Sequence, residues 1–206
     1  HSTTAIGLDN LAFVSSFYEA EDLFIRARKV REAIFGLDHP HTARGYINLA
    51  NLYTRHSLYE KAEISYKAAI SVFEHSLGSY HPEFTLSLIN LADFFIRIDR
   101  YDEAEVLLLR SLKIIEQSFG TRHQKYVLTL YNLGRVYEGK GLAEQAEHNF
   151  KQAISIFKTL QEYSTEHSQI NLANFIQRLA TLYTRMGKLT EAENLYNQSL
   201  SLFEDL

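Results

Sequence analysis

Apolar residues recur along this chain at helical spacing, in segments separated by short turns. Between residues 43 and 55 they lie at i, i+3, i+4 and i+7, at Tyr46, Leu49, Ala50 and Tyr53. This is the period of one face of an α-helix. The pattern therefore predicts an amphipathic helix over about residues 43–55.

A second amphipathic helix is predicted directly after the first. The turn at residues 56–58 reverses the chain, and helical spacing resumes from about Tyr59 to Leu77. Gly78 is expected to end this helix, because glycine enters the left-handed conformation at little cost. Pro82 is expected to open the next helix, where its missing N–H does no harm. The predicted unit is a helical hairpin, and we call its first and second members the A helix and the B helix.

The hairpin repeats with a period of 42 residues. The triplet Asn-Leu-Ala, or Asn-Leu-Gly, starts at residues 48, 90 and 132, and an Ala-Glu pair starts at residues 20, 62, 104 and 146. A fifth copy follows 46 residues after the fourth. A single hairpin cannot bury its apolar face, so the copies must stack to be stable.

These copies predict an all-α fold, a right-handed α-solenoid of about five helix-turn-helix repeats, in a single domain over residues 1–206. We expect a fragment of a longer protein, with repeats at about 1–42, 43–84, 85–126, 127–168 and 169–206. The first copy lacks a clear A-helix signature. The fourth copy replaces the usual loop with Glu162 to Thr165, where a longer helix or a looser joint is expected.

Residue size indicates how the helices pack. Small residues are expected where the A and B helices cross, and large ones between successive hairpins. The small residues are Ala50, Ala62, Ala92 and Ala104, and the large ones are Tyr53, Tyr66, Phe95 and Tyr137.

Three segments carry a family resemblance. They are Asn-Leu-Ala-Asn-Leu-Tyr at residues 48–53, Tyr-Glu-Lys-Ala-Glu at 59–63 and Leu-Gly-Ser-Tyr-His-Pro at 77–82. The pattern resembles the tetratricopeptide repeat in its longer 42-residue form, that of kinesin light chains, and it covers about residues 8–204. The resemblance implies an array that binds protein partners, with the A helices lining a concave groove.

The resemblance places the ligand-facing side chains on the A helices, between the core positions. The predicted peptide-binding residues are Arg44, Ile47, Asn48, Asn51, Arg55, Leu86, Ile89, Asn90, Arg97, Leu128, Tyr131, Asn132, Arg135, Gln177, Arg178 and Arg185.

Two features of these positions indicate the ligand. Asn48, Asn90 and Asn132 repeat at one place, and amides that both donate and accept can bind the backbone of an extended peptide. The ligand-facing positions hold six arginines and only two acids, Asp93 and Glu138, although the whole chain has a net charge of −4. A basic groove in an acidic chain favours an acidic peptide. The alternatives are that the amides serve packing and that the arginines pair with nearby acids.

Composition excludes several classes. The chain has no cysteine, which excludes disulfides and thiolate metal sites. An acidic chain is a poor nucleic-acid binder. The longest apolar runs, such as residues 106–109, fall far short of the ~20 residues that span a membrane. We expect a cytoplasmic protein with a protein or peptide partner, and neither nucleic acid nor a membrane.

Catalysis is not predicted. His39, His81 and His123 recur at one loop position, so we expect them to form hydrogen bonds near helix starts. No zinc-binding, P-loop or dinucleotide motif occurs, and no nucleophile stands at a credible spacing from a base. We therefore expect no catalytic residue, no metal site and no cofactor.

Other interaction roles stay open beside peptide binding. Leu195, Leu202 and Phe203 in the last hairpin could mediate self-association, and the array could sense a peptide within a larger protein. Ile47 stands where chaperone-binding relatives carry a clamp lysine, which disfavours a chaperone-tail ligand.

Overall fold

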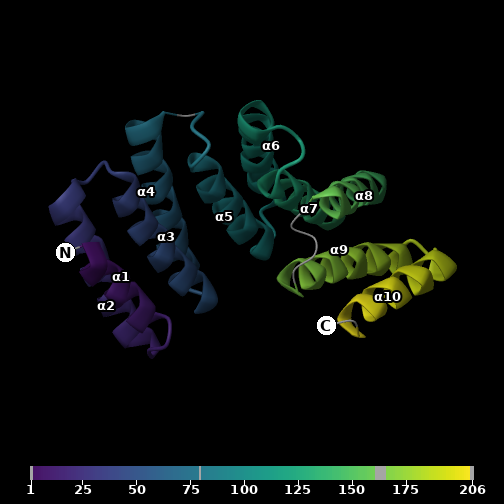
Figure 1. Ribbon diagram of the computed structural model, residues 1–206, viewed down its shortest axis with the longest axis horizontal. Helices are drawn as coiled ribbons and strands as arrows, with labels where there is room; N and C mark the ends of the chain where they lie inside the picture. Colours follow the sequence, from purple (N-terminus) through teal and green to yellow (C-terminus); the bar gives the residue numbers. More distant parts are fainter. Residues whose placement is uncertain (1, 79, 161–165, 205–206) are drawn as a thin grey trace. The chain divides into compact units, whose positions relative to one another are not determined.

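The computed structural model describes residues 2–78, 80–160 and 166–204, and these residues form ten α-helices and no strand (Figure 1). The prediction of an all-α chain of paired helices is confirmed. The helices are α1 (Ser2–Ala12), α2 (Phe17–Phe35), α3 (Pro40–Arg55), α4 (Tyr59–Leu77), α5 (Phe84–Arg97), α6 (Tyr101–Phe119), α7 (Gln124–Gly139), α8 (Ala143–Thr159), α9 (Glu166–Arg185) and α10 (Leu189–Glu204).

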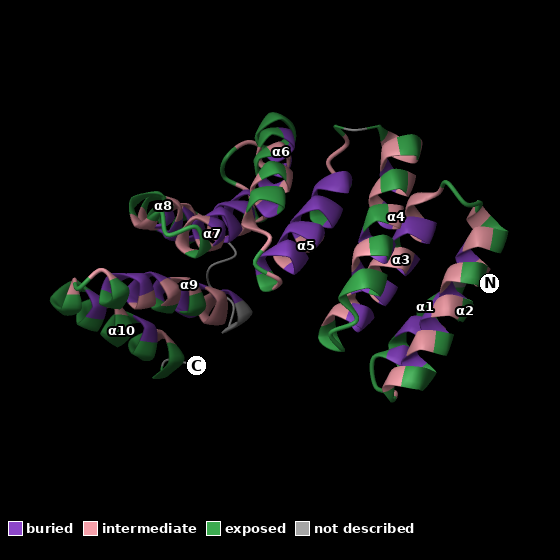
Figure 2. Ribbon diagram, turned by 180° about the vertical axis from the view of Figure 1, so that it is seen from behind, coloured by how far each residue is buried: buried purple, intermediate pink, exposed green. Residues whose placement is uncertain are grey.

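The chain divides into two compact units, His1–Phe94 and Phe95–Leu206, which we call unit 1 and unit 2. In unit 1, α1 packs on α2, α2 on α3 and α3 on α4. In unit 2, each helix from α6 to α10 packs on the next one along the chain. Figure 2 shows the buried residues on the helix sides that meet these neighbours. Contacts between consecutive helices are what stacked repeats require.

The helix boundaries follow the sequence with two differences. The α4 helix spans Tyr59–Leu77 as predicted, but α3 begins at Pro40, three residues before the predicted start. The earlier start is possible because proline fits the first helical turn. Pro82 does not open its helix, because α5 begins two residues later at Phe84.

Glycines end three B helices, as predicted. Gly36, Gly78 and Gly120 have φ angles of 93°, 84° and 76°, and each donates its N–H to the carbonyl four residues earlier. Their ψ angles of 169°, 157° and −179° are extended, so the backbone is not in the left-handed helical region that the sequence suggested. This combination of angles is essentially restricted to glycine.

The repeated histidines, which lie between a B helix and the next A helix, accept hydrogen bonds from backbone N–H groups. The Nδ1 atoms of His39 and His123 each accept a hydrogen bond from the N–H two residues later, at 3.1 Å, and His81 does the same at 3.2 Å. The rings of His39 and His123 also stack on Phe35 and Phe119, with centroids 4.7 and 4.4 Å apart. The predicted structural role of these histidines is confirmed.

The two irregular copies have different outcomes. The first copy does form an A helix, α1, which packs on α2 although its sequence signature is weak. The replaced loop of the fourth copy, Glu162 to Thr165, lies outside the described residues.

Small residues lie where helices approach most closely, as predicted. Ala50 and Ala62 are fully buried on the packed pair α3 and α4. In α7, Gly134 takes the position that Ala50 has in α3, and a Cβ at Gly134 would lie 2.5 Å from the ring of Phe150. Only glycine leaves room for the phenyl ring there.

A polar contact, which we call the Tyr–Glu clasp, joins successive hairpins. The Tyr53 hydroxyl donates to the Glu21 carboxylate at 2.8 Å, and the Lys61 ammonium donates to the same oxygen at 3.1 Å. In unit 2, the Tyr137 hydroxyl and the Lys140 ammonium donate to Glu105 at 2.9 and 2.6 Å. The glutamate in both cases is that of the repeated Ala-Glu pair.

The clasp recurs at the last hairpin. Glu147 accepts from the Tyr183 hydroxyl at 2.8 Å, from Lys188 at 2.8 Å and from Lys151 at 2.6 Å. Burial opposes ionisation of Glu147, but these three bonds outweigh it and lower the pKa of its carboxyl to about 2. In the remaining copy, the residue equivalent to these tyrosines is Phe95, which has no hydroxyl to donate. The division between the two units falls at this residue.

Candidate functional site

In unit 1 the predicted binding residues lie on one face of α3 and on α5. Arg44 and Arg55 are exposed, as is Leu86, whereas Ile89 is only 2% exposed. The remaining predicted residues of this unit, Ile47, Asn48, Asn51 and Asn90, are half-buried. The α3 residues share a face because they recur at helical spacing opposite buried Leu49, Ala50, Leu52 and Tyr53.

The two arginines of α3 are held differently from its amides. Neither Arg44 nor Arg55 forms an ion pair with another residue that the structure describes. Burial lowers the pKa of His41, and the nearby charge of Arg44 lowers it further. Asn51, in contrast, accepts a hydrogen bond of 2.6 Å from the Tyr66 hydroxyl, so its carbonyl already serves the hairpin. The exposed guanidiniums of α3 are thus available to a ligand.

In unit 2 a single carboxylate joins two predicted residues. The Oε2 atom of Glu138 accepts from the Nε of Arg178 at 2.8 Å, and its Oε1 atom accepts from the Nη1 of Arg185 at 2.7 Å. The Glu138 side chain is 4% exposed, whereas those of Arg178 and Arg185 are 39% and 64% exposed. We call Glu138 and these two arginines the α7–α9 arginine site.

Other predicted residues of unit 2 form contacts with neighbouring side chains of the same unit. Asn132 is 3% exposed and accepts a hydrogen bond of 2.9 Å from Arg135. Tyr131 stacks on Phe175, with ring centroids 4.4 Å apart. Leu128 is half-buried, and Gln177 and Arg97 are exposed. Burial leaves Asn132, like Ile89, without access to a ligand. The three repeated asparagines, Asn48, Asn90 and Asn132, are therefore not equally accessible.

The charge balance of unit 2 is basic around this site. Arg135, Arg178 and Arg185 carry three positive charges on the A helices α7 and α9, and Glu138 carries one negative charge. The pairing that the sequence left open is therefore real for Arg178 and Arg185, which share the single negative charge of Glu138. Since Arg185 is largely exposed, its remaining N–H groups can donate to a further carboxylate.

Sequence reasoning counted Glu138 only as an opposing charge and missed its role as an anchor. The available signal was its register, because Glu138 stands where α3 has Thr54 and α5 has Ile96. An acid that appears in a single copy, near the end of an A helix, is unusual within this repeat.

Two classes of site find no support among the described residues. No group of three or more His, Asp and Glu in residues 2–78, 80–160 or 166–204 could hold a metal ion. Within the same ranges, every helix is too short or too polar to pass through a bilayer.

Comparison with known proteins identifies the repeat. A family model described as tetratricopeptide repeat matches residues 5–75 and 84–159, and a second one with the same description matches 171–206. No protein of curated function matches the chain.

Solved structures share the fold. BtubC (BKLC) from P. vanneervenii is 20% identical, with a TM-score of 0.78 over 99% of this chain and 88% of that one. A putative kinesin light chain from Podosopora anserina, with nearly identical TPR-like repeats, is 21% identical, with a TM-score of 0.76 over 100% and 97%. A Rap protein complexed with competence and sporulation factor is 20% identical, with a TM-score of 0.72 over 92% of this chain and 50% of that one.

These matches confirm the repeat type that the sequence predicted, an α-solenoid of the kinesin light chain-like form. The family models together cover most of the chain. The chain belongs to the tetratricopeptide repeat family.

Proposed function

We propose that this protein-interaction scaffold binds an extended acidic segment of a partner protein on the exposed faces of its A helices. The α7–α9 arginine site carries the proposal. Glu138 holds Arg178 and Arg185 in place, so less side-chain entropy is lost when a ligand carboxylate binds them. Guanidiniums are suited to carboxylates because their N–H groups donate in pairs.

Unit 1 offers a second surface of the same chemistry. Arg44 and Arg55 flank the half-buried Ile47 and Asn48 on one face of α3. An apolar side chain of the ligand could pack on Ile47, and the amide of Asn48 could bind a peptide backbone. The ligand class is therefore an acidic peptide with apolar residues, and binding alone is proposed, with no catalytic step.

A charge reversal in the arginine site tests the proposal. Three fluorescein-labelled peptides of one length, rich in Glu, Gln or Lys and each with one Phe, are titrated against the chain by fluorescence anisotropy. The Glu-rich peptide should bind best, and Arg185→Glu should weaken it about tenfold, because a donor is replaced by a repelling carboxylate.

The matched control reverses an arginine away from the A helices. Arg26 lies on the B helix α2, is 59% exposed and has only Asp22 near it, at 3.5 Å. Arg26→Glu changes the net charge equally and should leave binding unchanged. Equal loss in both variants, or equal binding of the Glu-rich and Gln-rich peptides, would contradict a specific site.

Self-association is a second candidate, favoured by apolar side chains on α10. Leu189, Leu200 and Phe203 are 64%, 55% and 40% exposed. Leu200 and Phe203 lie three residues apart on one face of α10, and adjoining exposed apolar side chains are typical of contact surfaces. Light scattering over a concentration series should reveal a dimer that Leu200→Lys with Phe203→Lys disrupts, and a monomer at all concentrations would exclude this role.

A further inference from the structure

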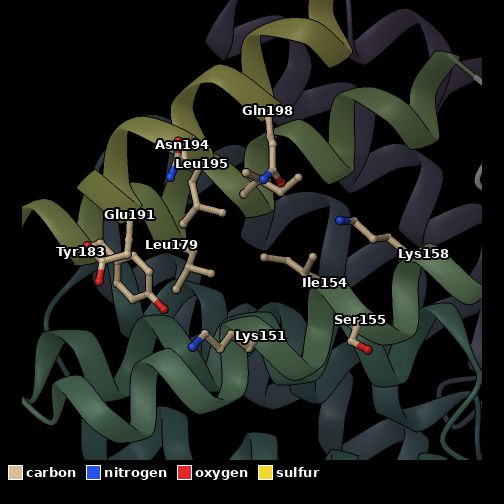
Figure 3. A pocket seen from close by; sticks show the side chains of 11 residues that line it. Lys151, Ile154, Ser155, Lys158, Leu179, Tyr183, Glu191, Asn194, Leu195 and Gln198 are labelled. Carbon is tan, nitrogen blue, oxygen red and sulfur yellow. The ribbon is translucent and has the colours of Figure 1, made fainter. Parts of the chain in front are cut away.

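A pocket of about 500 Å³ opens between α8, α9 and α10, all within unit 2 (Figure 3). Its apolar wall includes Ile154, Ile176 and Leu179, which are 9%, 2% and 3% exposed, together with the half-buried Leu195. The volume lies in the range of roughly 300–1,000 Å³ that is usual for ligand sites, and a mostly apolar lining with a few polar groups is typical of them.

The pocket lies on the opposite side of α9 from the arginine site. At about 100° per residue, Ile176, Leu179 and Tyr183 point roughly opposite to Arg178 and Arg185. A ligand in the pocket would therefore not touch the guanidiniums of the A-helix face. This is a separate surface and not an extension of the proposed peptide site.

One wall of the pocket is basic. Lys151, Ile154, Ser155 and Lys158 line it from α8 at i, i+3, i+4 and i+7. Lys151 already donates to Glu147 at 2.6 Å. Lys158 is exposed and forms no ion pair within the part of the chain that the structure describes. Lys158 is thus the cation that a ligand carboxylate would meet.

The opposite wall, on α10, carries two amides and, beside Tyr183, the Glu191 carboxylate. Asn194 and Gln198 lie one helical turn apart on α10, on either side of Leu195, and Figure 3 shows these three side chains on the pocket side of that helix. Each amide can donate and accept a hydrogen bond, which matches the alternating groups of a peptide backbone. A purely apolar ligand would leave these groups without partners.

Three residues of the pocket differ from those at the same positions in the preceding copy. One copy earlier, the position of Lys158 is occupied by Glu116, and those of Asn194 and Leu195 by His148 and Asn149. The preceding set of three helices, α6, α7 and α8, thus lacks this combination of a lysine and a leucine.

We propose that this pocket binds a short peptide segment that inserts a large apolar side chain next to an acidic residue. The apolar side chain would be buried against Leu179 and Leu195, and the acidic residue would pair with Lys158. Asn194 and Gln198 would hold the backbone between them. Burial of the apolar side chain provides the main driving force.

Selection of peptides tests the proposal. A phage-displayed random heptapeptide library is selected against the full chain, and one enriched peptide is synthesised with a fluorescein label for anisotropy. Enriched sequences should contain an apolar residue beside Asp or Glu. Leu195→Glu should weaken binding about tenfold, because it places a charge against an apolar wall. Lys158→Glu should weaken it about fivefold through lost attraction.

Two controls assign the effect to the pocket. Lys113, exposed on α6, stands one period before Ser155, and Lys113→Glu should bind like the parent. Arg26→Glu on α2, which reverses a positive charge outside the pocket, should also bind like the parent. Circular dichroism confirms that each variant is folded. The proposal is overturned if no such sequences are enriched, if both pocket variants bind like the parent, or if Lys113→Glu and Arg26→Glu weaken binding as much as Leu195→Glu does.

Discussion

The pair α3–α4 in unit 1 and the pair α7–α8 in unit 2 are the same sequence unit, 84 residues apart, and they differ in an instructive way. Both keep the Tyr–Glu clasp, through Tyr53 and Tyr137. Their tight contact differs, since α3 has Ala50 where α7 has Gly134. Their A helices also end differently, with Thr54 and Arg55 on α3 where α7 has Glu138 and Gly139.

The positions that the two helix pairs share and the positions at which they differ have separate roles. The clasp joins one hairpin to the next, so its loss would cost stability in either unit. At the helix ends, Arg55 is exposed, whereas Glu138, whose side chain is 4% exposed, pairs with two arginines of α9. Between these two pairs, the contact that holds hairpins together is the same, and the charge at the end of the A helix differs.

The largest expected effect on stability comes from the close helix contact that differs between the two pairs, at Gly134. Gly134→Ala would bring a methyl group to 2.5 Å from the Phe150 ring, which is fully buried and cannot move aside easily. We expect a loss of about 1–3 kcal/mol in the free energy of unfolding, measured by urea denaturation.

The control for this prediction is Gly7→Ala in α1, where a new Cβ meets no atom within 4 Å. Alanine is the better helix former, so this variant should equal the parent or gain about 0.5–1 kcal/mol. If Gly134→Ala is as stable as Gly7→Ala, the close approach of α7 and α8 is not what requires glycine.

The kept clasp should respond alike in both pairs. Tyr53→Phe and Tyr137→Phe each remove a hydroxyl that donates to a glutamate, and each should cost about 1 kcal/mol of unfolding free energy. Burial and the bond to Glu21 raise the pKa of Tyr53 to about 12, in keeping with a neutral donor. Tyr46→Phe serves as the comparison, because the Tyr46 hydroxyl accepts from Arg28 at 3.2 Å and does not reach a clasp glutamate. A clear difference between the two clasp variants would show that the units use this contact unequally.

The smallest effect is expected in the turns between A and B helices. Ser57 after α3 and Gly141 after α7 both have positive φ, 59° and 75°. A non-glycine residue pays a steric cost there, so Ser57→Gly should stabilise the chain by about 0.5 kcal/mol and Gly141→Ser should destabilise it by a similar amount. Thermal unfolding of both variants checks the pair, and destabilisation by Ser57→Gly would mean that the serine side chain matters more than the backbone angle.

The helical hairpins, the glycines that end the B helices and the histidine caps all followed from the sequence. These features depend on residues a few positions apart, such as His39 and the N–H of His41, so they can be predicted locally. The period of 42 residues carried the same prediction along the chain, and the repeat family followed from it. The single domain over residues 1–206 and the cytoplasmic location stay predictions.

Which surface residues are available to a ligand, and which are paired, depends on the packing of the helices. Ile89 and Asn132 carry the right pattern for a ligand-facing surface, yet both are buried in the folded chain. Arg178 and Arg185 meet Glu138 across 40 and 47 residues of sequence. The pocket of Lys158 and Leu195 likewise needs three helices at once. Such contacts depend on how helices are placed against one another, and periodicity fixes only the face of each helix.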